Sequence, residues 1–420
     1  MSSRRLATLV GLVALLLATA VLFSNRDEHR NQVEVTVPRQ PDSAGAFVDS
    51  IGVAMHLHYV DTAYARQADV FARLRELGVR HIREGAPVRA PELAKGLREA
   101  ARLGIGATLV TDIGIQPADA VAAGLREMRG RIDGFEGPNE LDLGKVPDWQ
   151  AQLRIYQPGL RAAAATQAPG VPVVGPSFLD PGHYDDVDAA SFDAASLHPY
   201  SGALPPEATL EEQLRRAHEV APQKQVLFTE TGFHNALAAT VGQPPTSEEA
   251  AADYLPRALL WAFAHGVERT FVYELLDELP EPALRDPEQH FGLLRQDFSP
   301  KPAFLALRNM IRAVSQSPGP AGVLAPFPKV ESRVHVEVVV LRRPDGSRLV
   351  ALWRPVPVWD RDGRRPIEPV PATATVTWPR AARDLSVLRP SLGEQPVTRH
   401  ASATRLQLAP AGDVVLLSYR

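Results

Sequence analysis

The sequence predicts a (β/α)8 TIM barrel followed by a small all-β, sandwich-like domain. From Phe47 to about residue 315, short apolar runs alternate with longer stretches of helical spacing. Strands that alternate with helices pair in parallel through right-handed crossovers. Eight such units fit into about 270 residues, close to the ~250 residues of a typical barrel. After residue 318, short β-rich runs follow without a convincing helix between them, as in a small all-β domain.

The barrel strands are expected at apolar runs, and the helices at the Ala/Leu/Arg/Glu-rich stretches between them. A doubly wound parallel sheet is the alternative fold, but no Gly-rich dinucleotide fingerprint opens any of the units. The eight expected strands are Phe47–His56, Val79–Arg83, Ala107–Thr111, Ile132–Glu136, Val171–Gly175, Ala194–His198, Val226–Glu230 and Thr270–Glu274. The expected helices are Ala65–Leu77, Pro91–Leu103, Pro117–Met128, Trp149–Gln167, Leu210–Ala221, Ser247–His265 and Lys301–Ala313.

The first 24 residues have the pattern of an export segment. Arg4 and Arg5 precede an apolar run from Leu6 to Phe23, and the small residues around Ala18 offer a cleavage site. The run is also close to the minimum length of a membrane span, so an uncleaved N-terminal anchor fits as well. Residues 1–24 therefore predict an exported chain, secreted or membrane-anchored, with a linker over residues 25–45.

The remaining chain divides into a barrel over residues 46–318 and a β-rich domain over residues 319–420. A stretch rich in chain breakers, 318–328, separates the two. The strands expected in the second domain are Val334–Leu341, Leu349–Pro355, Ala372–Trp378, Leu385–Arg389, Ala403–Ala409 and Val414–Tyr419.

Composition excludes several classes of function. The chain has 420 residues, of which 45% are hydrophobic and 22% charged, values typical of a folded globular protein. Its 45 Lys and Arg against 49 Asp and Glu give a formal charge of −4, without the basic field that nucleic-acid binding needs. It contains no cysteine, which excludes disulfides, thiolate metal sites and cysteine nucleophiles.

Polar residues collect where the predicted strands end. Barrel active sites lie at the C-terminal ends of the strands, so these residues meet on one face. Carboxylates with Arg, His and Tyr suit proton transfer and the stabilisation of a cationic transition state. The residues at this face are His56, Arg83, Asp112, Asn139, Glu140, His198, Tyr200, Glu230, Tyr273 and Glu274.

Two of these glutamates are placed to act together. Glu140 follows the fourth strand and Glu230 ends the seventh, 90 residues or three βα units later. Both lie at the barrel rim, so they can face each other across its mouth. Two carboxyl groups about 5–5.5 Å apart on either side of a glycosidic bond are the requirement of retaining glycoside hydrolysis.

Short motifs around these residues resemble those of clan A glycoside hydrolases, the barrel group that includes cellulases, xylosidases and mannanases. The stretch 135–140, Phe-Glu-Gly-Pro-Asn-Glu, resembles the acid/base motif, and 228–232, Phe-Thr-Glu-Thr-Gly, resembles the nucleophile motif. His198-Pro199-Tyr200 and Arg83 resemble further elements of strands six and two. Members often carry a Trp on strand eight as the floor of the sugar site; here that stretch is Phe271-Val272-Tyr273-Glu274, so the floor is either Tyr273 or absent. The resemblance covers roughly residues 47 to 315.

The resemblance implies a role for each residue. Glu230 is the expected nucleophile, held by Arg83 and Tyr200, and Glu140 the expected general acid and base. Asn139 is expected to donate to the 2-hydroxyl of the sugar, with His198 lining the same site. Further substrate contacts are expected from His56, Asp112, Trp149, Tyr273 and Glu274. The expected partner is a carbohydrate, and neither a metal nor an organic cofactor is required.

Three other functions remain as alternatives. His56 and His58 project from the same strand end, as in metal-dependent barrel hydrolases. A non-catalytic carbohydrate-binding surface protein on a glycosidase scaffold is a second alternative. Transglycosylation, which shares the covalent intermediate, is a third. A Ser-His-Asp esterase is disfavoured because the sequence has no Gly-x-Ser-x-Gly elbow.

Overall fold

The computed structural model describes residues 34–36, 42–144, 146–316 and 322–420. The predicted export or anchor segment, residues 1–24, lies outside the described residues. Among the described residues, no helix combines the length and the apolar character needed to cross a membrane.

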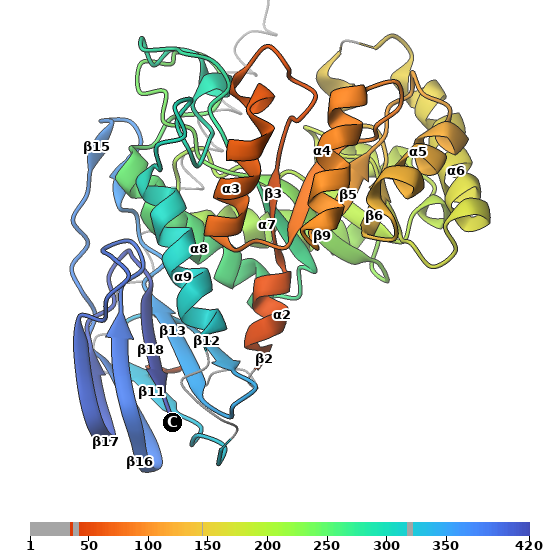
Figure 1. Cartoon of the computed structure of the whole chain (residues 1–420). Coiled ribbons are helices and arrows are strands. Elements are labelled where there is room, and N and C mark those ends of the chain that lie inside the picture. The colour runs from red at the N-terminus through yellow and green to blue at the C-terminus, as the bar shows by residue number, and fades with distance from the viewer. Residues whose placement is uncertain (1–33, 37–41, 145, 317–321) are drawn as a thin grey trace, which may run out of the picture.

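The described residues form the predicted closed barrel of eight parallel strands (Figure 1). Neighbouring strands in the chain pair in order, and the last strand pairs with the first, Thr270 opposite Ile51, to close the barrel. The strands are β3 (Ile51–Ala54), β4 (His81–Gly85), β5 (Gly106–Val110), β6 (Ile132–Glu136), β7 (Val173–Val174), β8 (Ala194–Leu197), β9 (Gln225–Thr231) and β10 (Arg269–Val272). Each predicted barrel strand thus corresponds to an observed one.

Helices surround the barrel where the apolar spacing predicts them. They are α3 (Gln67–Leu77), α4 (Pro91–Arg102), α5 (Pro117–Met128), α6 (Trp149–Gln167), α7 (Pro206–Val220), α8 (Glu248–Ala264) and α9 (Pro302–Ser315). Local signals fix several ends: Gly78 terminates α3 with φ 88°, and the Ser247 hydroxyl accepts from Ala250 N to cap α8. After β7 the described chain forms two 3-10 helices, η3 (Pro181–Asp186) and η4 (Ala189–Ser191), in place of an α-helix.

The first predicted strand is too long. Phe47, expected to begin it, lies in a short helix, α2 (Ala44–Asp49), which Ser43 caps by accepting from Ala46 N. The helix places Phe47 and Val48 in the core below the barrel. The apolar run therefore forms the end of a helix and then a strand. A short apolar run does not distinguish the two, because both elements can bury it.

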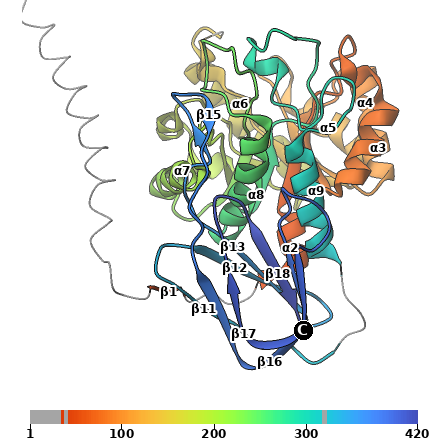
Figure 2. The same ribbon diagram turned by 90° about the vertical axis from the view of Figure 1, so that its left-hand side faces the viewer.

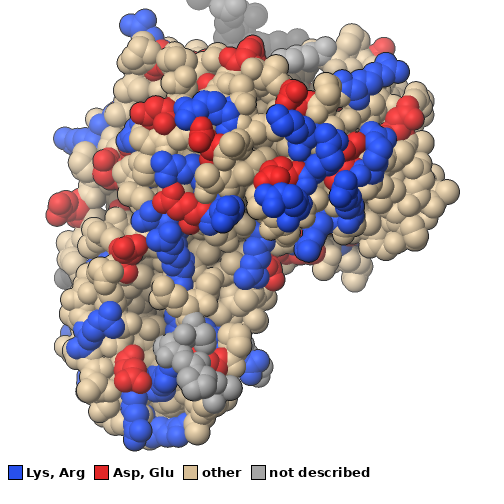
Figure 3. All heavy atoms as spheres, viewed as in Figure 1, with Lys and Arg blue, Asp and Glu red and all other residues tan. Residues whose placement is uncertain are grey.

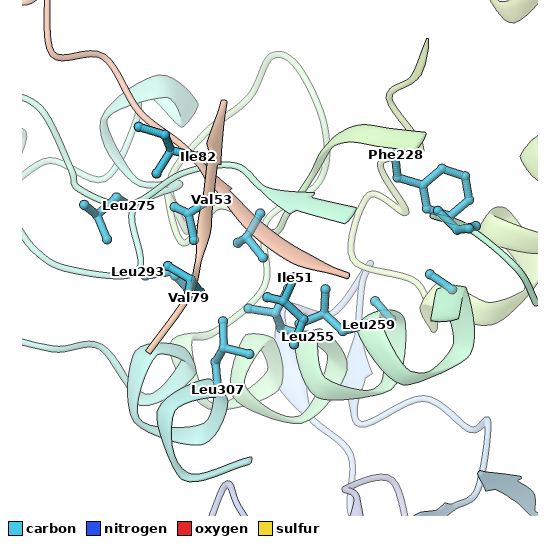
Figure 4. Packing of buried hydrophobic residues seen from close by; sticks show 14 of the residues in the cluster. Ile51, Val53, Val79, Ile82, Phe228, Leu255, Leu259, Leu275, Leu293 and Leu307 are labelled. Atoms are coloured by element: carbon cyan, nitrogen blue, oxygen red, sulfur yellow. The ribbon is translucent and has the colours of Figure 1, made fainter. Parts of the chain in front are cut away.

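The core lies between the strands and the outer helices. Figure 4 shows Ile51 of β3 beside Leu255 and Leu259 of α8, with Leu307 of α9 close by, while Val53 lies farther along the same strand. All five side chains are buried, at 2% exposure or less. Packing of branched aliphatic residues against β3 fixes the direction in which this strand leads to His56.

The C-terminal region is an antiparallel sheet beside the barrel (Figure 2). Its main strands are β11 (Lys329–Ser332), β12 (Glu337–Arg342), β13 (Arg348–Trp353), β16 (Ala374–Leu388), β17 (Thr398–Leu408) and β18 (Val415–Tyr419). The predicted strands at 372–378 and 385–389 are one 15-residue strand, β16. This strand pairs with β11 near its start and with β18 near its end. Both predicted segments therefore belong to the same sheet, whose buried side chains form a second core cluster.

The stretch predicted as a linker contributes to this sheet. β1 (Glu34–Thr36) pairs with β11, and β2 (Asp42–Ser43) pairs in parallel with β12. Short strands with few apolar residues give little sequence signal, and their pairing partners lie some 300 residues away in the chain. The chain therefore passes through the C-terminal sheet before it enters the barrel.

A buried charged pair joins the barrel to the sheet. Arg257 of α8 donates to both carboxylate oxygens of Glu207 at the start of α7, at 2.7 and 2.6 Å. Trp353 of β13 donates its indole N–H to Glu207 Oε1 at 2.8 Å, and Arg257 also donates to Val356 O. Each charge thus has hydrogen-bond partners in the interface, as a buried ion pair requires.

The visible surface carries both signs of charge. On the face drawn in Figure 3, Lys and Arg alternate with Asp and Glu over α3 and α4. Pairs such as Arg73 with Glu76 and Arg102 with Glu99 account for part of this pattern. The mixture of both charges on this face agrees with the near-neutral net charge of the sequence, which predicts no positive field.

Candidate active site

Glu230 lies near the end of β9, where it is 7% exposed and held on both carboxylate oxygens. Arg83 Nη1 donates to Oε1 at 2.6 Å, and the Tyr200 hydroxyl donates to Oε2 at 2.7 Å. His198 Nδ1 lies 3.6 Å from Oε2. Burial opposes ionisation, but the charges of His198 and Arg83 and the Tyr200 hydrogen bond outweigh it, so the pKa of Glu230 is held below its ordinary value.

Arg83 is itself fixed by a buried carboxylate. Glu136, at the end of β6, accepts from Nε at 2.7 Å and from Nη2 at 2.9 Å. Ser196 of β8 donates to Glu136 Oε1 at 3.1 Å. Since Glu136 is fully buried and occupied on both oxygens, the guanidinium has one orientation available, with Nη1 toward Glu230.

Glu140 comes from the loop that follows β6. Its backbone is left-handed, with φ 45°, and its N–H donates to Ser177 O at 3.0 Å. Left-handed backbone in a non-glycine residue is uncommon and concentrates at functional sites. Gly137 makes the turn possible, because a Cβ there would lie 2.2 Å from Gln157 Oε1.

The two glutamates lie together across the barrel mouth. One ligand atom each of Glu140, His198 and Glu230 lies within 4.8 Å of the others. His198 stands between the carboxylates, with Nδ1 2.7 Å from Glu140 Oε1. An upper limit of 4.8 Å between one oxygen of each carboxylate is compatible with the about 5–5.5 Å of retaining glycosidases and lies below the about 6.5–9.5 Å of inverting ones.

Asn139 is oriented by its side-chain oxygen. Oδ1 accepts from Arg83 Nη2 at 2.6 Å and from the Ser177 hydroxyl at 3.0 Å. Because the oxygen accepts both of these hydrogen bonds, the amide nitrogen points away from them and can donate to another group. The side chain therefore offers two N–H groups next to the two glutamates.

The opposite wall is formed by the residues that follow β10 and β3. The Tyr273 ring lies 6.5 Å from that of Tyr200 and 5.7 Å from that of His56. The Tyr64 hydroxyl donates to Glu274 Oε2 at 2.8 Å. Burial, followed by the charge of Glu278, raises the pKa of Glu274 well above its ordinary value.

Two predicted contact residues lie away from the glutamate pair. Trp149 is 9% exposed and packs against Phe178 and His183 in the core, where it begins α6. Asp112 is exposed and accepts from Gly114 N at 2.7 Å, as in an Asx turn. Trp149 is thus a core residue, and within the described part of the chain the hydrogen bond of the Asp112 side chain goes to its own loop and not to the site.

Comparison with known proteins gives matches among solved structures. No protein-family model matches the chain, and no curated protein sequence matches it. A family 39 glycoside hydrolase from Bacteroides cellulosilyticus WH2 matches at 17% identity over 92% of this chain and 83% of its own, with a TM-score of 0.60. The GH39 enzyme from Xanthomonas axonopodis pv. citri matches at 15% identity over 95% of this chain and 99% of its own, with a TM-score of 0.57.

The chain has the fold of the family 39 glycoside hydrolases. A monomeric β-xylosidase from Caulobacter crescentus CB15 also matches, at 16% identity over 93% of this chain and 98% of its own, with a TM-score of 0.57. These matches extend over the barrel and the C-terminal sheet alike. At such identity the likeness is one of fold, and the expected residue roles depend on the site geometry above.

The structure also shows three residues of the site that the sequence analysis did not single out. Tyr64, Ser177 and Ser196 hold Glu274, Asn139 and Glu136 in place. Tyr64 and Ser177 lie in loops after β3 and β7, where no periodic pattern marks them. Ser196 faces inward in the middle of β8, a position that the alternation of a strand indicates only once the barrel is known.

The two histidines after β3 have different carboxylate partners. His58 Nδ1 lies 3.2 Å from Glu84 Oε1, while His56 faces Glu274, its Nε2 3.6 Å from Oε2. Glu84 also accepts from Leu57 N at 2.6 Å, which fixes the loop between the two rings. The groups able to share a cation within the described residues are His56–Glu274–Glu278 and Glu140–His198–Glu230, and neither includes His58.

Proposed function

We propose that this protein is a retaining glycoside hydrolase that cleaves O-glycosidic bonds of an oligo- or polysaccharide by a two-glutamate double displacement. The observation that carries the proposal is the pair Glu140 and Glu230, whose carboxylates lie within 4.8 Å of each other in unlike surroundings. Glu230 is fixed by two donors that favour its ionised form, whereas the side-chain hydrogen bond of the Glu140 carboxylate within the described residues goes to His198. Different environments for two neighbouring carboxyl groups allow different roles.

In the first step Glu230 attacks the anomeric carbon and forms a glycosyl ester. Glu140 begins protonated and donates to the departing oxygen, so the leaving group departs as an alcohol. Arg83 and Tyr200 keep the Glu230 carboxylate ionised and aimed before the attack.

In the second step Glu140 accepts a proton from water, which attacks the anomeric carbon and releases Glu230. Once Glu230 is esterified it no longer carries a charge that repels a second carboxylate. Attack on the same face from which the leaving group departed gives net retention. An acceptor sugar in place of water turns the same step into transglycosylation.

Asn139 and His198 position the reacting groups. The free amide N–H groups of Asn139 suit the 2-hydroxyl of the sugar, a contact that strengthens as charge develops at the anomeric carbon. His198 contacts Glu140 and faces Glu230, so it couples the two carboxyl groups.

The cellular location is proposed with the function. Arg4, Arg5 and the apolar run to Phe23 support export, with the barrel outside the cytoplasm either released or held by the N-terminal segment. A fusion of residues 1–45 to a reporter active only outside the cytoplasm tests this part separately.

The function is tested by screening aryl glycosides and polysaccharides with the wild-type protein beside Glu230→Gln. Because a matching structure is a β-xylosidase, aryl β-xylosides are among the first to test. We expect turnover of at least one substrate by the wild type and its loss in Glu230→Gln. Equal turnover by both proteins, or turnover abolished by a chelator, would favour the metal-dependent alternative. Carbohydrate binding without turnover would favour a binding protein.

A further inference from the structure

The hairpin of β16 and β17 has one face in the core and one face in solvent. Three buried residues of β16 belong to the second core cluster: Val376, Ala382 and Val387. Successive side chains of a strand point to opposite faces, so the neighbours of these core residues point outward. Thr377, Arg383 and Ser386 are such neighbours, and Arg383 is exposed.

β17 adds two exposed arginines to the outward face. Arg405 pairs opposite Thr377, and Arg399 pairs opposite Ser386. Residues directly opposite each other in a sheet point to the same face, so both arginines lie on the side of Arg383. Arg399 and Arg405 are six positions apart in β17, which gives a row about 20 Å long. We call Arg383, Arg399 and Arg405 the arginine face.

Little negative charge lies beside the arginine face. β16 and β17 contain one carboxylate, that of Asp384. Within the described part of the chain, the guanidinium groups of the arginine face form no ion pair and no hydrogen bond. Their charges are therefore available to an anionic partner outside the chain.

The net charge of −4 is divided unequally between the two regions of the molecule. Residues 322–420 contain 15 Lys and Arg against 9 Asp and Glu, whereas residues 42–321 contain 25 against 37. The C-terminal region is thus positive and the barrel negative. Such an asymmetry orients a molecule at a charged surface, because one end is attracted and the other is repelled.

The arginine face and the catalytic mouth belong to opposite ends of the molecule. Figures 1 and 2 show β16 and β17 at the lower end. In Figure 1, β3 rises from α2 towards the loops at the upper end, and the loops that follow the barrel strands carry the candidate active site. An anionic surface that contacts the arginine face therefore leaves the mouth open to solution.

The N-terminal segment enters the molecule beside this hairpin. Ten residues, 24–33, separate the apolar run that ends at Phe23 from Glu34, the first residue of β1, and they span at most about 35 Å. β1, β11, β16 and β17 are successive strands of the sheet, so about 14 Å separates β1 from β17. A chain held in a bilayer by its apolar run thus keeps the arginine face near the surface of that bilayer.

We propose that the arginine face binds the surface of an anionic lipid bilayer and so turns the catalytic mouth away from the membrane. This inference goes beyond the proposed glycosidase function and rests on retention of the N-terminal segment. One arginine near an anionic bilayer strengthens binding about fivefold, so the three together contribute about a hundredfold. The apolar run keeps the chain at the membrane, and the arginine face sets its orientation there.

Energy transfer from a dye on the hairpin to the bilayer tests this orientation. The chain contains no cysteine, so Ser402→Cys, opposite Arg383, provides a single site for a donor dye. The full chain is reconstituted into nanodiscs of phosphatidylcholine, with or without about 30% phosphatidylglycerol, that carry an acceptor dye on a lipid headgroup. We expect at least about twofold more transfer with phosphatidylglycerol, and about 0.5 M NaCl should abolish the difference by screening.

Two triple variants and a second dye position serve as controls. Replacement of all three residues of the arginine face by Gln should abolish the effect of phosphatidylglycerol. The matched variant, which should keep the effect, replaces three exposed barrel arginines by Gln: Arg75, Arg154 and Arg216. A dye on Ala283→Cys, in the loop that follows β10, should show the same low transfer in both lipids.

Equal transfer from the hairpin dye in both lipids overturns the inference, as does an effect that persists without the arginine face. A response of the hairpin dye to soluble polygalacturonate but not to phosphatidylglycerol also overturns it and assigns the face to an acidic polysaccharide. Turnover of the selected glycoside, measured in the same nanodiscs, should not depend on the arginine face. Failure of this inference therefore leaves the proposed function standing.

Discussion

At the scale of single residues, neighbouring side chains give the two glutamates of the site different properties, although the glutamates are chemically identical. Glu230 has an arginine, a tyrosine and a histidine around its oxygens, and these neighbours stabilise the charge that a nucleophile needs. Glu140 has the same histidine, whereas the arginine and the tyrosine donate to Glu230. The assignment of attack to one glutamate and proton transfer to the other follows from this difference.

Replacement of Tyr200 by Phe should shift the pH dependence of the reaction. In the proposed mechanism the ionised Glu230 is the active form, so kcat/KM should rise as pH rises through the pKa of this group in the free protein. Loss of the Tyr200 hydrogen bond removes one influence that lowers this pKa, so the acid limb should move to higher pH. A hydrogen bond to a charged group is worth about 1.5–3 kcal/mol, so we also expect a loss of about tenfold or more at the optimum.

The control for this variant is Tyr156→Phe, since Tyr156 lies on α6 and its hydroxyl contacts neither glutamate. An acid limb that stays in place in Tyr200→Phe, or moves equally in Tyr156→Phe, would show that Tyr200 does not tune the nucleophile.

Replacement of Glu140 by Gln should separate the two chemical steps. A dinitrophenyl glycoside has a leaving group that needs no proton, so ester formation should remain fast while its hydrolysis, which needs the Glu140 base, becomes slow. Rapid-mixing experiments should show a burst of one equivalent of phenolate followed by a turnover at least about a hundredfold slower than that of the wild type. Linear release without a burst would contradict the role of Glu140 in the second step.

The residues that sequence alone identifies are those at the ends of strands. Glu140, Glu230, Arg83 and Tyr200 lie within motifs whose order along the barrel is informative. Its place after a strand predicts Trp149 at the site, but Trp149 also starts a helix, and its packing places it in the core. A position near a strand end therefore indicates the catalytic face and does not show which way a side chain points.

At the scale of elements, close approach between strand ends shapes the site. A Cβ at Gly232, just after β9, would lie 2.1 Å from Tyr273 O. Tyr273 N in turn donates to Thr231 O at 2.8 Å, which ties the end of β9 to the wall that carries Tyr273 and Glu274. The glycine thus allows the nucleophile strand and the opposite wall to share one edge.

Gly232→Ala should destabilise the protein and reduce activity together. The backbone must move to admit the methyl group, and overpacking of this kind costs about 1–3 kcal/mol. Gly85→Ala is the matched control, because a Cβ at that strand end would lie 3.7 Å from its nearest neighbour, an ordinary contact. Urea denaturation and kcat/KM check both variants, and a Gly232→Ala protein as stable and active as Gly85→Ala would show that the close approach is not needed.

Local patterns predict these elements well where one periodicity holds over the whole run. Pro117–Met128 and Trp149–Gln167 begin and end as helices at the predicted residues. The pattern is misleading where two elements share an apolar run, as at Phe47, or where one long strand carries a polar interruption, as in β16. In both places tertiary packing decides, and a window of a few residues does not contain that information.

At the scale of the whole molecule, a separate two-stranded hairpin of the C-terminal region supports the rim of the barrel. The hairpin of β14 (Trp359–Asp360) and β15 (Arg365–Pro366) contacts the loop that follows β9. Trp359 Nε1 donates to Pro245 O at 3.0 Å, and Arg364 Nη2 donates to Ala239 O at 2.8 Å. A segment more than 110 residues distant in the chain thus fixes the loop beside the nucleophile strand. No local sequence signal marks such a contact.

Glu207→Ala should destabilise the barrel and the sheet together. Arg257 would remain buried without its carboxylate partner, which costs about 3–5 kcal/mol, and both regions would unfold in one transition at lower denaturant. Glu212→Ala on the same helix removes an exposed ion pair with Arg215 and should cost less than about 1 kcal/mol. Equal stability of the two variants would show that the interface pair does not couple the regions.

The covalent ester on Glu230 is the central claim, and trapping it is the most direct test. The probe is a 2-deoxy-2-fluoro glycoside with a dinitrophenolate leaving group, made from the sugar that the screen selects. The fluorine slows both steps, but the good leaving group keeps the first step fast enough for the ester to accumulate. Peptide mass spectrometry should find one sugar on the peptide that contains Glu230 in the wild type and none in Glu230→Gln. A label on a different residue, or turnover with inverted configuration and no label, would contradict the account.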